Sequence, residues 1–181
     1  MKKTTEQFIK EIFEFVCQNG LENTSIRDIC KDTGMSTGSL YYRFKSKEGV
    51  VISVGTYGLN KVADDLFSYA LSTIGELKVF FDSFLGIVKT RQPELRAVYQ
   101  IATSPVYGQN MRKMAETLNI RYEKYIERLS NVLRISIEEL TPIVFMIISV
   151  MLDYVVWDDY KVAQMQMNTL YNILSGMQKR F

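Results

Sequence analysis

The sequence predicts an all-α protein of about nine helices, and two observations support this fold class. Apolar residues recur with the helical period of about 3.6 residues along nearly the whole chain, whereas a strand-like alternation is rarely sustained. The 181 residues also include only three prolines and ten glycines, the residues that most often interrupt helices. A content of 47% hydrophobic and 23% charged residues is typical of a globular protein.

The first two predicted helices span about residues 4–19 and 25–32. Gly20 follows the first helix at the position where a glycine commonly ends one. Ser25 and Asp28 have the spacing of a capping box, in which each side chain binds the other residue's backbone amide. The apolar faces of the two helices consist of Phe8, Ile9, Ile12, Phe13, Val16, Cys17, Ile26, Ile29 and Cys30.

Each of the next two predicted helices begins after a serine that can act as its N-cap. Ser36 precedes a helix over about residues 37–44, and Ser46 precedes a longer helix over about residues 47–70. The shorter of the two helices is predicted to bury Leu40 and Phe44.

Five further helices are predicted in the rest of the chain. Pro93 and Pro142 each stand at a first helical position, where the missing amide hydrogen costs little. Thr141 would be the N-cap before Pro142, and Ser136 and Glu139 form another capping box. The five helices span about residues 74–90, 93–102, 106–133, 142–157 and 162–179.

The composition argues against most enzyme classes. Histidine is absent from the sequence. The chain therefore cannot form a Ser-His-Asp or Cys-His catalytic system, and it cannot bind a metal through histidine. Cys17 and Cys30 have apolar neighbours, which is typical of small thiols buried in a protein of the reducing cytoplasm. We therefore expect no catalytic residues, no metal and no cofactor.

The sequence also indicates a cytoplasmic location without a membrane partner. Residues 4–10 are too polar for the apolar core of a secretory signal. The most apolar run, residues 143–152, is too short to cross a bilayer.

The first fifty residues have the layout of a helix-turn-helix, because a tight turn over residues 33–36 joins two short helices. We assign residues 1–50 to a DNA-binding domain, with the motif at about 25–44, and residues 51–181 to a helical ligand-sensing and dimerisation domain. The net charge of the chain is only +2, but the window of residues 33–47 holds three basic residues and no acidic one. Such a local excess of positive charge favours contact with phosphates.

Polar side chains are predicted to face outward from the third helix. Hydroxyl groups can donate to phosphates or base edges, and Lys47 lies at a helix N-terminus, which suits a phosphate. The predicted DNA-binding residues are Arg27, Thr37, Ser39, Tyr41, Tyr42, Arg43, Lys45 and Lys47.

The segment SIRDICKDTGMSTGSLYYRFKSKE at residues 25–48 resembles the DNA-binding segment of the tetracycline-repressor (TetR) family, and the resemblance covers roughly residues 6–51. It implies an all-α homodimer that binds a near-palindromic operator in double-stranded DNA, usually as a repressor released by a small molecule. By position, Tyr41 and Lys47 would contact phosphates, while Arg27 would lie near the DNA backbone. The resemblance also implies three groove-facing residues, Thr37, Ser39 and Tyr42.

Two positions depart from the family pattern. Cys30 stands where alanine is more common, which is a small change in the core. Arg43 stands where the family often has an aromatic residue or histidine, and an additional phosphate contact is one role for it. The C-terminal two-thirds of such proteins diverge widely, so the resemblance identifies no ligand.

Two apolar patterns near the C-terminus predict a homodimer. The last helix has apolar residues at alternating spacings of four and three, which is the pattern of a coiled-coil seam. The helix before it is apolar around most of its circumference and needs burial on several sides. The residues predicted at the dimer interface are Met167, Leu170, Leu174 and Met177. The alternative is that both helices pack inside one chain.

The aromatic and methionine residues of the middle helices predict either an ordinary core or the lining of an apolar ligand cavity. Asp153 and Trp157 are four positions apart on one helix face and are predicted to bind a ligand or a partner chain. The predicted ligand-binding residues are Phe80, Phe84, Tyr99, Tyr107, Tyr122, Met146, Asp153 and Trp157.

Taken together, these patterns favour a sequence-specific transcriptional regulator, most simply a repressor released from its operator by an unknown, small and largely apolar effector. The alternative is a helical dimer that uses its helix-turn-helix for protein contacts. Nothing in the sequence supports an enzyme.

Overall fold

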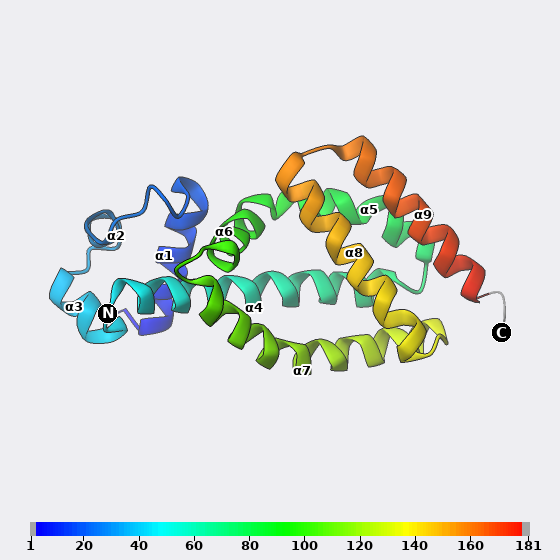
Figure 1. The fold of residues 1–181 in the computed structure, drawn as a ribbon, viewed down its shortest axis with the longest axis horizontal. Helices are drawn as coiled ribbons and strands as arrows, with labels where there is room; N and C mark the ends of the chain where they lie inside the picture. Colours follow the sequence, from blue (N-terminus) through cyan, green and yellow to red (C-terminus); the bar gives the residue numbers. More distant parts are fainter. Residues whose placement is uncertain (1–2, 179–181) are drawn as a thin grey trace. The chain divides into compact units, whose positions relative to one another are not determined.

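The structure is a computed structural model that describes residues 3–178, without the side chains of residues 112–121. The described residues form nine α-helices and no strand, which confirms the predicted fold class (Figure 1). The chain forms two compact units. The first unit comprises Met1–Val62 and Pro93–Thr117, and the second comprises Ala63–Gln92 and Leu118–Phe181.

The first three helices are α1 (Thr5–Asn19), α2 (Ile26–Thr33) and α3 (Thr37–Phe44). Their boundaries agree with the predicted ones to within one residue, because the predicted caps form. The side chain of Ser25 accepts from the Asp28 amide while Asp28 accepts from the Ser25 amide. Gly34 adopts the left-handed conformation, with a φ of 71°, that ends α2.

Three boundaries among the later helices differ from the prediction by three or more residues: the end of α4 (Lys47–Thr73) and the starts of α5 (Leu77–Thr90) and α8 (Ile137–Trp157). Helix α5 begins three residues late, because α4 continues to Thr73 and Glu76 is the N-cap. Helix α8 begins at Ile137 after the Ser136 cap, so the prediction that Pro142 opens it is wrong. The predicted end of the last helix at residue 179 lies outside the described residues. The six helices are α4 (Lys47–Thr73), α5 (Leu77–Thr90), α6 (Gln92–Thr103), α7 (Gly108–Leu133), α8 (Ile137–Trp157) and α9 (Tyr160–Gln178).

Pro142 is tolerated inside α8 because it lies close to the helix start. Its missing amide removes a single bond of the backbone ladder. The neighbouring Thr141 hydroxyl donates to the carbonyl of Ile137 at 2.6 Å. Ser136 and Glu139 then form the first cap of one continuous helix, with the Glu139 amide donating to the Ser136 hydroxyl.

The core of the first unit joins the helix-turn-helix to α6 and the start of α7. Leu40 of α3 is fully buried, and so is Ile101 of α6. Two glycines let the other helices approach α4 closely: a Cβ at Gly58 would lie 2.3 Å from the Phe13 ring, and one at Gly55 would lie 2.9 Å from the Met111 sulfur. The predicted domain boundary at residue 50 does not coincide with the limits of this unit and stays a prediction.

The core of the second unit is built from α5, α8 and α9 together with the parts of α4 and α7 that belong to it. Phe80 packs against Phe81 and Phe84, with ring centroids 5.1 and 5.0 Å apart. Helix α9 packs on both α5 and α8. Its residue Met167 is fully buried in this core.

Three of the four residues predicted at the dimer interface on α9 are buried within the chain. These three are Met167, Leu170 and Leu174. Met177, at the end of the same stripe, is partly buried. The heptad-like spacing indicates a helix–helix contact, but spacing alone does not tell whether the partner helix is in the same chain. The assignment of a dimer interface to these residues stays a prediction.

Candidate nucleic-acid interface

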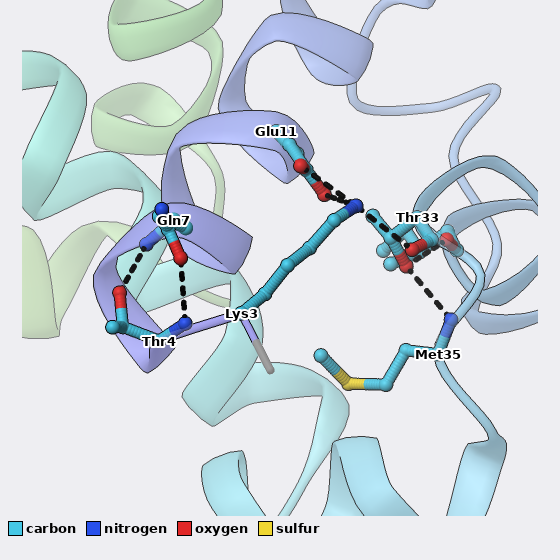
Figure 2. Close-up of polar contacts among 7 residues, drawn as sticks. Lys3, Thr4, Gln7, Glu11, Thr33 and Met35 are labelled. Carbon is cyan, nitrogen blue, oxygen red and sulfur yellow. Dashed lines mark hydrogen bonds and ion pairs between the residues drawn. The ribbon is translucent and has the colours of Figure 1, made fainter. Parts of the chain in front are cut away.

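The turn between α2 and α3 is fixed by backbone and side-chain hydrogen bonds. The Thr33 hydroxyl donates to the Ile29 carbonyl at 2.8 Å and accepts from the Met35 amide at 3.4 Å (Figure 2). The Ser36 hydroxyl accepts from the Ser39 amide at 3.2 Å and so caps α3. Because α3 has only eight residues, its orientation depends on these contacts and on the core beneath it.

The outward face of α3 exposes the side chains that were predicted to contact DNA. The Tyr42 side chain is 81% exposed and that of Tyr41 is 40% exposed, which is unusual for large aromatic residues. Thr37 is exposed and Ser39 is half-buried on the same helix. On the neighbouring elements, Arg27, Lys45 and Lys47 are exposed. The structure thus brings seven of the eight predicted residues to accessible positions around α3.

Arg43 differs from the other predicted residues because its guanidinium is turned toward α1. It donates to the Thr5 hydroxyl at 2.6 Å, and its central carbon lies 5.3 Å from the centre of the Phe8 ring. Arg43 is half-buried. The sequence contained no signal for this contact, because Thr5 and Arg43 are 38 positions apart.

The two lysines of the interface are held differently. Lys45 ends α3 with a φ of 67°, donates to the Tyr42 carbonyl at 3.2 Å and lies 5.4 Å from the centre of the Tyr42 ring. Lys47 opens α4, where the first amides of the helix attract an anion. The next residue, Glu48, accepts from the Asn110 side chain at 2.7 Å.

The acidic side chain of the α2 capping box is also held by hydrogen bonds. Bonds from the Ser25 hydroxyl and amide lower the pKa of Asp28 below its ordinary value, so this carboxylate stays ionised at the start of α2. Cys17 behaves as the expected inert thiol, because burial raises its pKa to about 12. Among the described residues, no group of three or more cysteine or acidic side chains could hold a metal ion.

The predicted ligand-binding residues are distributed over both units. Phe80 and Phe84 are core residues of the second unit, whereas Tyr99 and Tyr107 belong to the first unit. Tyr122 lies against the Phe67 ring at 5.1 Å. Met146, Asp153 and Trp157 are exposed on α8. The assignment of these eight residues to a ligand site stays a prediction.

Helices α8 and α9, which the sequence predicted to form an apolar interface, lie side by side in the second unit and expose several large apolar side chains (Figure 1). The most exposed of these side chains are Trp157, which is 73% exposed, and Met165, which is 62% exposed. Among the described residues, α8 is also long and apolar enough to cross a membrane by length and composition alone; 44% of the tested window is buried, and a single helix of this kind is weak evidence for a membrane span. We call this exposed apolar surface of the two helices the α8–α9 face; it comprises Phe145, Met146, Val156, Trp157, Tyr160, Val162, Met165 and Ile173.

Comparison with known proteins identifies the N-terminal part of the chain. The family of bacterial regulatory proteins described as the tetR family matches residues 10–54, which include most of α1, all of α2 and α3, and the start of α4. No curated protein and no solved structure matches the chain.

Proposed function

We propose that this chain, whose residues 10–54 match the tetR family, is a DNA-binding transcriptional regulator of that family and acts as a repressor released from its operator by a small effector. The observation that supports the site best is the outward face of α3. It exposes hydroxyl groups, two tyrosines and nearby cations, and none of the fifteen residues from Thr33 to Lys47 is acidic. Such a face matches the phosphates and groove edges of a duplex.

The DNA site is tested by selection of duplexes from a random pool of DNA by the full-length protein. We expect the protein to enrich one near-palindromic sequence. A double variant, Tyr42→Ala with Lys47→Ala, should lose most of its affinity for that sequence, because it lacks one groove-facing and one phosphate-facing group per protomer. Enrichment of no sequence would favour the alternative, in which the helix-turn-helix contacts proteins. Full affinity in the double variant would contradict the role of α3 and of the start of α4.

We further propose that the protein is a homodimer joined through the α8–α9 face. The eight apolar side chains of this face are exposed on two packed helices that also bury apolar residues in the core of the second unit. An exposed apolar surface of this kind commonly marks an interface between proteins. A second copy is the expected partner, since a two-fold dimer would present two α3 helices to half-sites about 34–36 Å apart. Sedimentation equilibrium at micromolar concentration should give a dimer, and a stable monomer would contradict the proposal.

The effector is proposed to bind among the aromatic residues of the second unit. Phe67 of α4 stacks on Tyr125 at 4.8 Å and lies 5.1 Å from Tyr122, and the Tyr125 hydroxyl donates to Asp64 at 3.1 Å. Aromatic side chains with a few polar groups are suited to a small, largely apolar molecule. Helix α4 would transmit the signal, because it runs from Lys47 into the second unit.

The repressor role follows from differential affinity. An effector releases the DNA only if it binds more tightly to an arrangement of the dimer that fits the operator poorly. In bacteria, a reporter gene placed behind the selected operator should be silenced by this protein in the cytoplasm. Activation of the reporter by the protein would contradict the repressor role and leave DNA binding intact.

A further inference from the structure

Two contacts connect the start of α1 to the ends of both helices of the helix-turn-helix. Lys3 forms an ion pair with Glu11 at 2.8 Å and also donates to the carbonyl of Thr33, at the end of α2, at 3.4 Å (Figure 2). Arg43, at the end of α3, donates to Thr5 and stacks on Phe8. We call these six residues, Lys3, Thr5, Phe8, Glu11, Thr33 and Arg43, the N-terminal clamp.

We propose that Arg43 is a positioning residue, which acts through Thr5 and Phe8 to hold α3 at the orientation needed for DNA, and that it is not itself a phosphate contact. This inference rests on the proposed DNA-binding function and deepens it. A guanidinium that both donates to a fixed hydroxyl and stacks on a fixed ring is restrained in position and in plane. The restraints on Arg43 lie on α1, whereas the side chain of its neighbour Tyr42 is 81% exposed and can reach DNA.

Within the clamp, Lys3 contacts the C-terminal end of α2. Its ammonium group lies near the last carbonyl of α2, where a cation interacts favourably with the helix dipole. The same ammonium group lies 5.5 Å from the centre of the Phe8 ring, so both cations of the clamp use one aromatic side chain. Glu11 neutralises Lys3, while Arg43 is bound by a neutral hydroxyl and the ring. Residues at and just before the start of α1 therefore hold the C-terminal ends of both α2 and α3.

The N-terminal clamp should matter for recognition more than for folding. Ion pairs at the protein surface contribute little to the free energy of unfolding. However, a recognition helix that moves in the free protein must be ordered when DNA binds, and this ordering lowers the affinity. This ordering lowers the affinity of the specific complex, in which α3 must fit the groove. Non-specific binding is affected less, because it depends mainly on charge.

The test compares variants of the full-length protein that alter Arg43 with variants that alter only its partners. The probes are the duplex selected by the unaltered protein and a scrambled duplex of the same length and composition. Arg43→Gln removes the guanidinium, whereas the pair Thr5→Val and Phe8→Leu removes the contacts on α1 and leaves every charge in place. Lys10→Gln is the control, because it removes one positive charge from an exposed ion pair on α1 outside the clamp.

If Arg43 is a positioning residue, both changes lower the ratio of specific to non-specific affinity by about tenfold, the factor expected for one hydrogen bond and one cation–π contact. A variant that combines Arg43→Gln with Thr5→Val and Phe8→Leu should show no further decrease in the ratio of specific to non-specific affinity. A purely structural role would lower the melting temperature and leave this ratio unchanged. A phosphate contact would give full affinity in the Thr5→Val and Phe8→Leu variant, with a reduced salt dependence in Arg43→Gln. Either of these last two results would overturn the proposal.

The test also separates failure of this inference from failure of the proposed function. A protein that selects no duplex contradicts the proposed function. Hydrogen exchange of the α3 amides needs no DNA, and these amides should exchange several times faster in the Thr5→Val and Phe8→Leu variant than in Lys10→Gln. Equal exchange in the two variants would show that the clamp does not hold α3.

Discussion

The two units differ in what they leave exposed after their cores are complete. In the first unit, α3 buries Leu40 and Phe44 and exposes hydroxyls, tyrosines and cations. In the second unit, α8 and α9 bury one apolar stripe each and still expose further large apolar side chains. The first exposed face suits a polyanion, and the second suits another apolar surface. The comparison teaches that the residues of an amphipathic helix that remain exposed after the core has formed indicate what the helix binds.

The largest expected effect compares one leucine in each core. Leu40 is 0% exposed in the first unit and Leu174 is 1% exposed in the second. Changing either leucine to alanine should lower the free energy of unfolding by about 2–5 kcal/mol, which denaturant titration measures. Leu40→Ala should also abolish specific DNA binding, because Leu40 supports α3 directly. Equal DNA affinities in the two folded variants would remove the distinction between the units.

The next effect concerns the α8–α9 face. Met165→Glu would place a charge in the proposed dimer interface, where burial of an unpaired carboxylate is costly. The protein should become a monomer in sedimentation at micromolar concentration while its helical circular dichroism is retained. Asn168→Asp is the control, since it adds a charge on α9 and keeps the oxygen that accepts from Gln164. A dimer in both variants would exclude this face as the interface.

A smaller effect distinguishes two exposed helical glycines. A Cβ at Gly38 of α3 or at Gly86 of α5 would meet no atom within 4 Å, so the fold itself requires neither glycine. Gly38→Ala and Gly86→Ala should each raise the free energy of unfolding by up to about 1 kcal/mol. Only Gly38→Ala should weaken DNA binding, because the added methyl group would separate α3 from the groove. Unchanged affinity in Gly38→Ala would argue against a close approach at this turn.

The smallest effect is the pH dependence of the capping box. The hydrogen bonds from Ser25 lower the pKa of Asp28 below its ordinary value of 3.8. The ionised form therefore stabilises the fold at pH values above 3.8, and this contribution disappears as the pH falls through the lowered pKa. Titration of the Asp28 carboxyl by NMR should show that Ser25→Ala raises its pKa toward 3.8. An equal pKa in both proteins would show that the box is not formed in solution.

The sequence was most informative where a local rule determines the structure. The caps at Ser25, Ser36 and Ser136 and the glycine at position 34 predicted helix ends, because the partner amides lie within three residues. Pro142 misled the prediction, since its position near the start of α8 can be judged only when the true cap is known. The outward residues of α3 were predicted from the two residues that the helix must bury.

The sequence was least informative where the partner of a side chain is distant along the chain. The contact of Arg43 with Thr5 spans 38 positions, and no local pattern predicts it. The stripe of Met167 and Leu174 predicted a helix partner, but its periodicity is the same whether that partner belongs to this chain or to a second copy. The sequence predicted an apolar interface on α8 and α9, but the residues of the α8–α9 face could be told from the core residues only after the buried stripe was assigned.

The central claim is that the first unit binds DNA in a sequence-dependent way through α3 and the start of α4. The most direct measurement is the dissociation constant for the selected and the scrambled duplex as a function of salt concentration, for the unaltered protein and for Lys47→Ala. The account predicts a higher affinity for the selected duplex at every salt concentration, and a salt dependence whose logarithmic slope falls by about 0.9 for each phosphate that Lys47 no longer neutralises. Equal affinities for the two duplexes, or an unchanged slope in Lys47→Ala, would contradict it.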